Sequence, residues 1–243
     1  MDLQADSVQG VLFLTPGQQQ DDALKLWEHL FPGDSPDGFQ RANPSPSLLS
    51  TALGERTGHR VMVNAQVGRI DIILNQSPAI VDLSGSPPRI ADVPAAARRM
   101  GELMKLMAGR LKVLRIALVL DLAKTVSPGV ETAELLHFLP GYPFPKNVTD
   151  VSVQFNSRKT FESVPNIDMN RLCVWTTGQI GFIQSQPVQG TGMMIMSPVV
   201  NVRVDVNSAP EARPPVDSVT PIIDEILAES LEIYAEGLKR FGQ

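Results

Sequence analysis

The chain has 243 residues, of which 43% are hydrophobic and 19% are charged, and its formal net charge is −5. This composition is typical of a globular protein with a sizeable core, and the acidic balance argues against non-specific binding to nucleic-acid phosphates. The single cysteine, Cys173, excludes an internal disulfide and a multi-cysteine zinc site.

Strand and helix signals alternate at the start of the chain. Residues 8–15 form an apolar run that predicts a strand, and Pro16-Gly17 end it. The next segment has apolar residues at helical spacing and stops at Pro32-Gly33, so we expect a helix there. Residues 48–56 then predict a strand that leads into a hairpin.

The stretch 60–75, RVMVNAQVGRIDIILN, organises the first half of the chain. Apolar and polar residues alternate on both sides of Gly68, a residue that can take the positive φ of a tight turn, so the stretch predicts a β-hairpin. A helix should follow, because Asp92 is a good N-cap and Pro94 suits a first turn. We expect this helix to end at Gly109 in the left-handed conformation.

The second half of the chain gives similar signals in the same order. Residues 113–122 are the most hydrophobic strand and should lie at the centre of a sheet. A short helix over residues 127–139 and an alternating strand over residues 150–156 follow. Residues 170–185 predict a second hairpin with its turn at Thr177-Gly178, and one more strand precedes the last helix.

The last element is a long amphipathic helix. Acidic residues dominate its first turns, and Lys239 and Arg240 lie at its end, as the helix dipole favours. Leu227 and Leu231 lie in the middle of its apolar stripe, so we expect both to be buried, whereas Glu229 should face outward. The stripe consists of Ile223, Ile226, Leu227, Leu231, Tyr234, Leu238 and Phe241.

The order strand, helix, strands, helix therefore occurs twice. Two landmarks agree, because one helix ends in HLFPG from His29 and its counterpart in HFLPG from His137, and the predicted turn glycines follow at similar distances. We interpret residues 1–110 and 111–243 as two half-repeats of one compact, pseudo-symmetric unit. The fold class is then α+β, with both halves contributing to one antiparallel sheet.

This doubled order resembles the fold of the TATA-binding protein, and the resemblance implies one continuous, curved antiparallel sheet with helices on one face. The hairpin with its following loop, together with the final helix that closes on Phe241-Gly242, also resembles a sporadically distributed family of uncharacterised bacterial proteins. Neither resemblance brings catalytic residues with it, so no site residue is assigned from either.

Few residues form a pattern that indicates chemistry. An enzyme with a site of scattered residues would use Asp121 and Lys124, which follow the strongest strand, and His137. Simpler interpretations exist, since a carboxylate there commonly ends a strand and a histidine in a last helical turn can bind free carbonyls. Trp175 and Arg171 are candidate ligand-binding residues on the uncovered sheet face, where an aromatic ring can stack on a ligand, and burial of Trp175 is the alternative.

We therefore expect a non-enzymatic binding or protein-interaction module that uses the sheet face not covered by helices. A protein partner or a homo-oligomer is expected, without a cofactor or metal, since three histidines and one cysteine leave little room for a metal site. Nucleic-acid binding is a third hypothesis, which the net charge opposes. The acidic start MDLQADSV is unlike a signal peptide, and no apolar run is long enough to span a bilayer, so we expect a cytoplasmic location.

Overall fold

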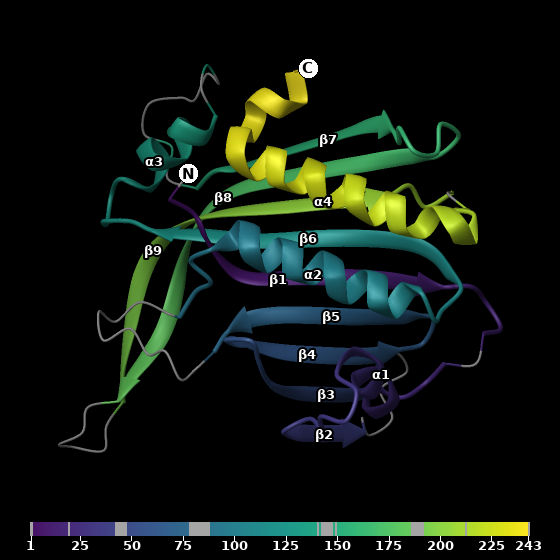
Figure 1. Ribbon diagram of the computed structural model, residues 1–243. Coiled ribbons are helices and arrows are strands. Elements are labelled where there is room, and N and C mark those ends of the chain that lie inside the picture. Colours follow the sequence, from purple (N-terminus) through teal and green to yellow (C-terminus); the bar gives the residue numbers. More distant parts are fainter. Residues whose placement is uncertain are drawn as a thin grey trace.

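The computed structural model describes residues 2–18, 20–41, 48–77, 88–139, 141, 148, 150–185, 192–211 and 213–242. Within these residues the chain forms nine strands, four α-helices and two short 3-10 helices (Figure 1). In chain order they are β1 (Gln4–Leu14), α1 (Ala23–Leu30), β2 (Gly38–Arg41), β3 (Leu48–Arg56), β4 (His59–Gln66), β5 (Arg69–Gln76), α2 (Val93–Ala108), β6 (Val113–Thr125), α3 (Glu131–Phe138), β7 (Ser152–Thr160), β8 (Asp168–Ser185), β9 (Gly192–Ser208), η1 (Val216–Ser218), α4 (Val219–Glu236) and η2 (Gly237–Gly242). No helix in this part of the chain is long and apolar enough to cross a membrane.

The strands form one antiparallel sheet in the order β2-β3-β4-β5-β1-β6-β9-β8-β7. The sheet is curved, and the helices lie on one of its faces, with α2 and α4 running across the middle (Figure 1). The predicted α+β class and sheet arrangement are therefore confirmed. Outward from the centre, β5, β4 and β3 follow β1 in the way that β9, β8 and β7 follow β6. An internal duplication as the origin of this shared order stays a prediction.

The first predicted hairpin consists of β4 and β5. Gly68 has a φ of 69° in the turn between them. The strands pair from His59↔Gln76 to Gln66↔Arg69, so alternate residues of both strands face the helices. The buried residues of this hairpin include Val61, Val63, Ala65, Ile70, Ile72 and Leu74.

The second predicted hairpin is wrong. Asp168–Ser185 form one continuous strand, β8, which pairs with β9. Gly178 lies inside this strand opposite Val199, and unlike Gly68 it does not have a positive φ. Pairing between β8 and β7 ends at Thr176. The change of pattern in the sequence therefore marks the point where β8 leaves the main sheet and not a turn.

The predicted start of α2 is confirmed, but its predicted end is wrong. Asp92 accepts a hydrogen bond from the backbone N–H of Ala95 at 2.9 Å, and Pro94 occupies the first turn. Gly109 follows the helix with a φ of −62°, in the right-handed region. Its N–H still donates to the carbonyl of Lys105 at 3.0 Å, so the helical bonding continues to this residue and no left-handed cap forms.

The central strand β1 lets α2 approach closely at Gly10. A Cβ atom at this position would lie 2.6 Å from Cγ of Met104 and 2.8 Å from Sδ of Met100. The two methionines therefore fill the space above the glycine, as expected for flexible side chains in a core. This contact joins the helix layer to the middle of the sheet.

The buried face of α4 is rotated from the predicted stripe. Leu227 and Leu231 are only half-buried, whereas Glu229, which we predicted to face outward, is 3% exposed. Glu229 accepts hydrogen bonds from Arg171 of β8 at 3.0 Å and from Arg240 of η2 at 2.9 Å. These bonds turn that side of the helix toward the sheet. The buried residues of α4 are Val219, Ile222, Ile223, Ile226, Glu229, Ser230 and Ile233.

Candidate binding site on the open sheet face

The two predicted ligand-binding residues lie on the helix-covered face. Trp175 is 1% exposed, and its ring centre lies 5.7 Å from that of Phe155 and 6.2 Å from that of Phe241. Arg171 is buried, donates to Glu229, and holds its guanidinium 5.4 Å from the ring centre of Phe241. Their predicted place on the uncovered face is therefore wrong, because β8 turns these alternate residues toward α4 and η2. The alternative that Trp175 is buried is confirmed.

The three residues of the predicted enzyme alternative do not come together. Asp121 and Lys124 are three positions apart on β6, so they lie on opposite faces of the sheet. Lys124 donates to Glu134 of α3 at 3.0 Å on the helix-covered side, and His137 lies in the last turn of α3. Asp121 alone of the three belongs to the open face.

The open face has a fixed polar layer near its middle. Asp71 is 2% exposed and accepts hydrogen bonds from Arg69 at 2.7 Å and from Gln66. Across the sheet, Arg115 donates to Asn207 at 2.9 Å. Because these polar side chains bind one another, they are held in place. Few of their hydrogen-bonding groups can then bind a ligand.

Two adjoining hollows at one end of this face share Asp6. The pairing of β1 with β6 shifts register between Ala5 and Ser7, which places Asp6 at an irregularity of the strand. Arg89, whose side chain is 3% exposed, donates to Asp6 at 2.6 Å and to Thr125 at 2.8 Å, and so fixes the carboxylate between the hollows. The first hollow, of about 380 Å³, is lined by Asp6, Arg60, Met62, Asn75, Gln76 and Pro88. The second, of about 280 Å³, is lined by Asp6, Asp121, Leu122, Asn201, Val202 and Arg203.

The carboxylate of Asp121 forms a fixed wall of the second hollow. It accepts a hydrogen bond from the hydroxyl of Ser7 at 3.2 Å and one from Arg203 at 3.0 Å. Both bonds come from strands that flank β6, so they hold the carboxylate over the sheet. Asp121 thus contributes a positioned acceptor.

Several polar side chains around the hollows have no partner among the described residues. Arg60 and Asn75 are cross-strand neighbours of β4 and β5, and Asn201 lies on β9. Their side chains form no hydrogen bond or ion pair with another described residue. One guanidinium and two carboxamides therefore remain available beside the carboxylate of Asp6.

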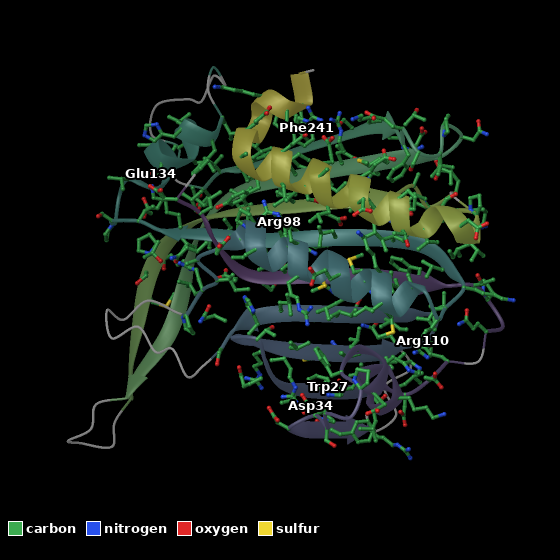
Figure 2. The ribbon with its side chains drawn as sticks, viewed as in Figure 1. Trp27, Asp34, Arg98, Arg110, Glu134 and Phe241 are labelled. Carbon is green, nitrogen blue, oxygen red and sulfur yellow. The ribbon has the colours of Figure 1, made fainter. Side chains whose placement is uncertain are left out.

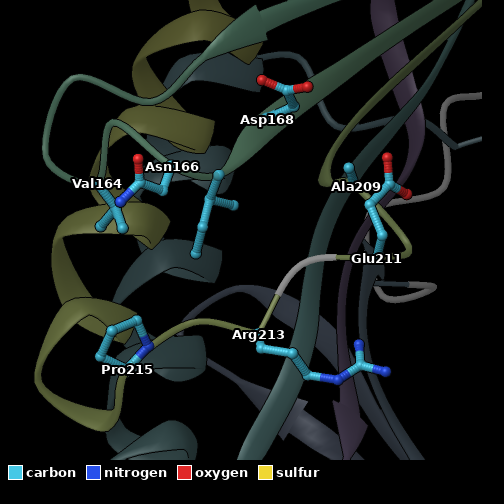
Figure 3. A pocket seen from close by; sticks show the side chains of 8 residues that line it. Val164, Asn166, Asp168, Ala209, Glu211, Arg213 and Pro215 are labelled. Carbon is cyan, nitrogen blue, oxygen red and sulfur yellow. The ribbon is translucent and has the colours of Figure 1, made fainter.

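A larger hollow, of about 430 Å³, lies at the opposite end of the sheet between the loops that follow β7 and β9 (Figure 3). Its charged groups already have partners: Glu211 binds Arg158, Asp168 accepts from Thr160 at 3.3 Å, and Arg213 donates to a backbone carbonyl. A hydrogen bond from its own backbone N–H and one from Arg158 hold the pKa of Glu211 below its usual value. This hollow is therefore a weaker candidate than the pair at Asp6. Its lining is Val164, Asn166, Ile167, Asp168, Ala209, Glu211, Arg213 and Pro215.

Sequence reasoning missed the residues of this site, although part of the signal was visible. Arg60 and Asn75 occupy the polar side of the predicted hairpin, so alternation alone places them on the face away from the core. The position of Asp6 could not be predicted in this way. It depends on the register shift in β1 and on an ion pair with Arg89, which is 83 residues away in sequence.

Neither a metal site nor a reactive thiol is formed by the described residues. They contain no group of three or more His, Cys, Asp or Glu side chains that could hold a metal ion. Burial raises the pKa of the Cys173 thiol well above its usual value, so the thiol stays protonated and out of reach of solvent. Comparisons of the chain with protein families, with characterised proteins and with solved structures found no match.

Proposed function

We propose that the protein is a non-enzymatic binding module that holds a polypeptide partner over the two hollows around Asp6. The proposal rests on the unpaired polar groups there, namely the guanidinium of Arg60 and the carboxamides of Asn75 and Asn201. Each projects from a strand of the sheet, beside carboxylates that other residues hold in place. A partner that binds these carboxylates meets groups that are already in place, so it loses little free energy to their rearrangement.

The chemistry of the site favours a polypeptide over a nucleic acid. Carboxamides both donate and accept hydrogen bonds, so Asn75 and Asn201 suit the alternating N–H and C=O groups of a peptide backbone. Arg60 and Met62 are residue types that are enriched at protein interfaces. The net charge of −5 also opposes a partner rich in phosphates.

Site-specific photo-crosslinking in the native host tests this assignment. A crosslinking amino acid in place of Arg60 or Asn201 should capture a polypeptide, because both positions line the hollows. The same amino acid in place of Leu106, which is 53% exposed on α2, should not capture it. Capture from Leu106 alone, or no capture from the open face, would contradict the proposal.

A pair of arginine variants then measures the contribution of the site to affinity. Arg60→Ala should weaken binding of the captured partner by roughly tenfold or more, as expected for an interface arginine that pairs with its partner. Arg98→Ala is the matched control, because Arg98 is an exposed arginine on α2, on the helix-covered side (Figure 2). Equal affinities of the two variants in a calorimetric titration would show that the hollows are not the binding site.

A further inference from the structure

Beyond the main sheet, β8 and β9 continue as a two-stranded ribbon that stands away from the body of the protein (Figure 1). The pairing of β8 with β7 ends at Thr176, and the pairing of β9 with β6 ends at Val199. Among the described residues, β8 pairs only with β9 from Gly178 to Ser185, and β9 pairs only with β8 from Gly192 to Ser197. Because an isolated two-stranded ribbon is marginally stable in water, a further partner is expected.

The ribbon lacks the charges that protect the other edges of the sheet. Between Arg171 and Arg203 the sequence contains no Asp, Glu, Lys, Arg or His. The outer strand β7 carries Arg158 and Lys159, and the outer strand β2 has only four residues. Charged and short edge strands prevent pairing with other molecules, so the ribbon is the unprotected edge of this sheet. Met196 of the ribbon is also 50% exposed.

Hydrogen bonds at the base of the ribbon identify the backbone groups that point outward from β8. The N–H of Thr177 donates to the carbonyl of Val151 at 3.0 Å, away from β9. Antiparallel strands alternate between inward and outward backbone groups, so the N–H and C=O of Gln179 and Gly181 also point away from β9. This β8 edge has free donors and acceptors and contains no proline up to residue 185.

The β9 edge of the ribbon is less suited to pairing. The carbonyl of Pro198 points outward and accepts a hydrogen bond from Val126 at 3.0 Å. Proline has no N–H, so one outward donor is missing from this edge. Of the two edges, β8 is therefore the better template for another strand.

We infer that the β8 edge pairs with the same edge of a second copy of this chain, in antiparallel orientation about a two-fold axis. Two identical antiparallel edges match each outward N–H with an outward C=O, and no like charges oppose the contact. The free edge of β8, from Gly178 to Ser185, is eight residues long, or about 27 Å. An edge contact of this length buries less than the ~1,200 Å² of a standard stable interface, so the dimer should be weak and should depend on concentration.

Sedimentation velocity of the full chain over a wide range of concentrations tests the inference. The unaltered protein should move from monomer to dimer as its concentration rises. Gly181→Pro removes an outward N–H without removing a bond to β9, so it should abolish the dimer while the circular dichroism and the melting temperature stay unchanged. Met196→Pro is the matched control, since Met196 lies directly across the ribbon from Gly181 and its change removes an outward N–H from the other edge. The control should keep the dimer.

A second variant covers the case in which the proline prevents folding. Gly181→Lys places a positive charge on each of the two paired edges, so its dimer should weaken at low salt and recover as salt is added. A dimer that survives both changes at Gly181, or that Met196→Pro also abolishes, overturns the inference. A protein that stays monomeric at all concentrations also overturns the inference. This includes a monomer whose ribbon binds phosphatidylcholine vesicles, which co-sedimentation with the vesicles would detect. Arg60→Ala should leave the dimer intact, which separates this contact from the proposed binding site.

Discussion

Glu229 shows how one buried carboxylate fixes the position of a helix. It accepts hydrogen bonds from Arg171 and Arg240, and Nζ of Lys159 lies 3.7 Å away. Burial alone would raise the pKa of Glu229, but the hydrogen bonds and charges of Arg240 and Arg171 outweigh it and hold the pKa below its ordinary value of 4.5. A lowered pKa in the folded state stabilises the fold above the ordinary value, and this contribution is lost as the pH falls through the folded-state pKa.

Glu229→Gln should therefore lower the free energy of unfolding by about 2–4 kcal/mol at neutral pH, since it leaves the buried guanidinium of Arg171 without its counter-charge and removes one of the two carboxylates that bind Arg240. Below pH 4.5 the difference from the unaltered protein should shrink, because Glu229 itself becomes protonated. Urea titrations at neutral and acidic pH measure both effects. Glu232→Gln on the same helix, where the side chain is 47% exposed, should cost less than about 1 kcal/mol. Equal losses from both variants would show that the buried ion pairs do not hold α4.

At the scale of the elements, the packing of α1 on the sheet depends on the close contact between Trp27 of α1 and Gly54 of β3. Trp27 is fully buried, and its indole N–H donates to the carbonyl of Asp34 at 2.8 Å. The guanidinium of Arg56 lies 5.0 Å from the centre of the ring. A Cβ atom on Gly54 would lie 2.9 Å from the ring edge. The indole is held on several sides, so only glycine at this position leaves room for it.

Two glycine variants test this attachment and its contrast with α2. Gly54→Ala should lower the free energy of unfolding by about 1–3 kcal/mol, because the added methyl group meets a ring that cannot move aside. Gly109→Ala should raise it by about 0.4–1 kcal/mol, since alanine accepts the right-handed conformation there and loses less entropy on folding. Its Cβ would meet nothing closer than 3.5 Å. Thermal melting compares the two variants, and an unchanged midpoint for Gly54→Ala would refute the close approach.

Elements with local signals could be predicted from the sequence, and those that depend on distant partners could not. The cap at Asp92 and the turn at Gly68 are decided within a few residues, and both predictions are confirmed. Gly178 has the same local signal as Gly68, but β9 continues alongside it, so it lies within a strand. Glu229 belongs to the polar side of the helix by periodicity, and only its partners on β8 and η2 bury it. For the site, the alternation of apolar and polar residues in the hairpin predicts that Arg60 lies on the face away from the core. The shape of the hollows cannot be predicted in this way, because it depends on strand register.

At the scale of the whole molecule, the two halves share one sheet and one core. β1 and β6 pair across the middle, from Val8↔Leu120 to Leu12↔Ile116. Buried residues from both halves belong to a single hydrophobic cluster. Each half alone would expose the edge of its central strand, together with apolar residues that the other half covers.

The fragments 1–110 and 111–243 should therefore not fold separately. Each should melt without a cooperative transition, because half of the central pairing and part of the shared core are missing. Mixing the two fragments should restore the cooperative transition and the β-sheet signal in circular dichroism. Cooperative melting of either fragment by itself would mean that the chain consists of two independent domains.

The pairing of β1 with β6 also determines the order in which the chain can fold. Leu12 meets Ile116 across about a hundred residues of intervening chain, whereas β4 meets β5 across a two-residue turn. Hairpins form in microseconds, but sheets that join distant strands fold in milliseconds to seconds. The pairing of β1 with β6 is thus a late event in folding. Before these two strands pair, the edges that they present to each other are open to strands of other molecules. Refolding at high concentration therefore competes with aggregation at the most hydrophobic strand of the protein.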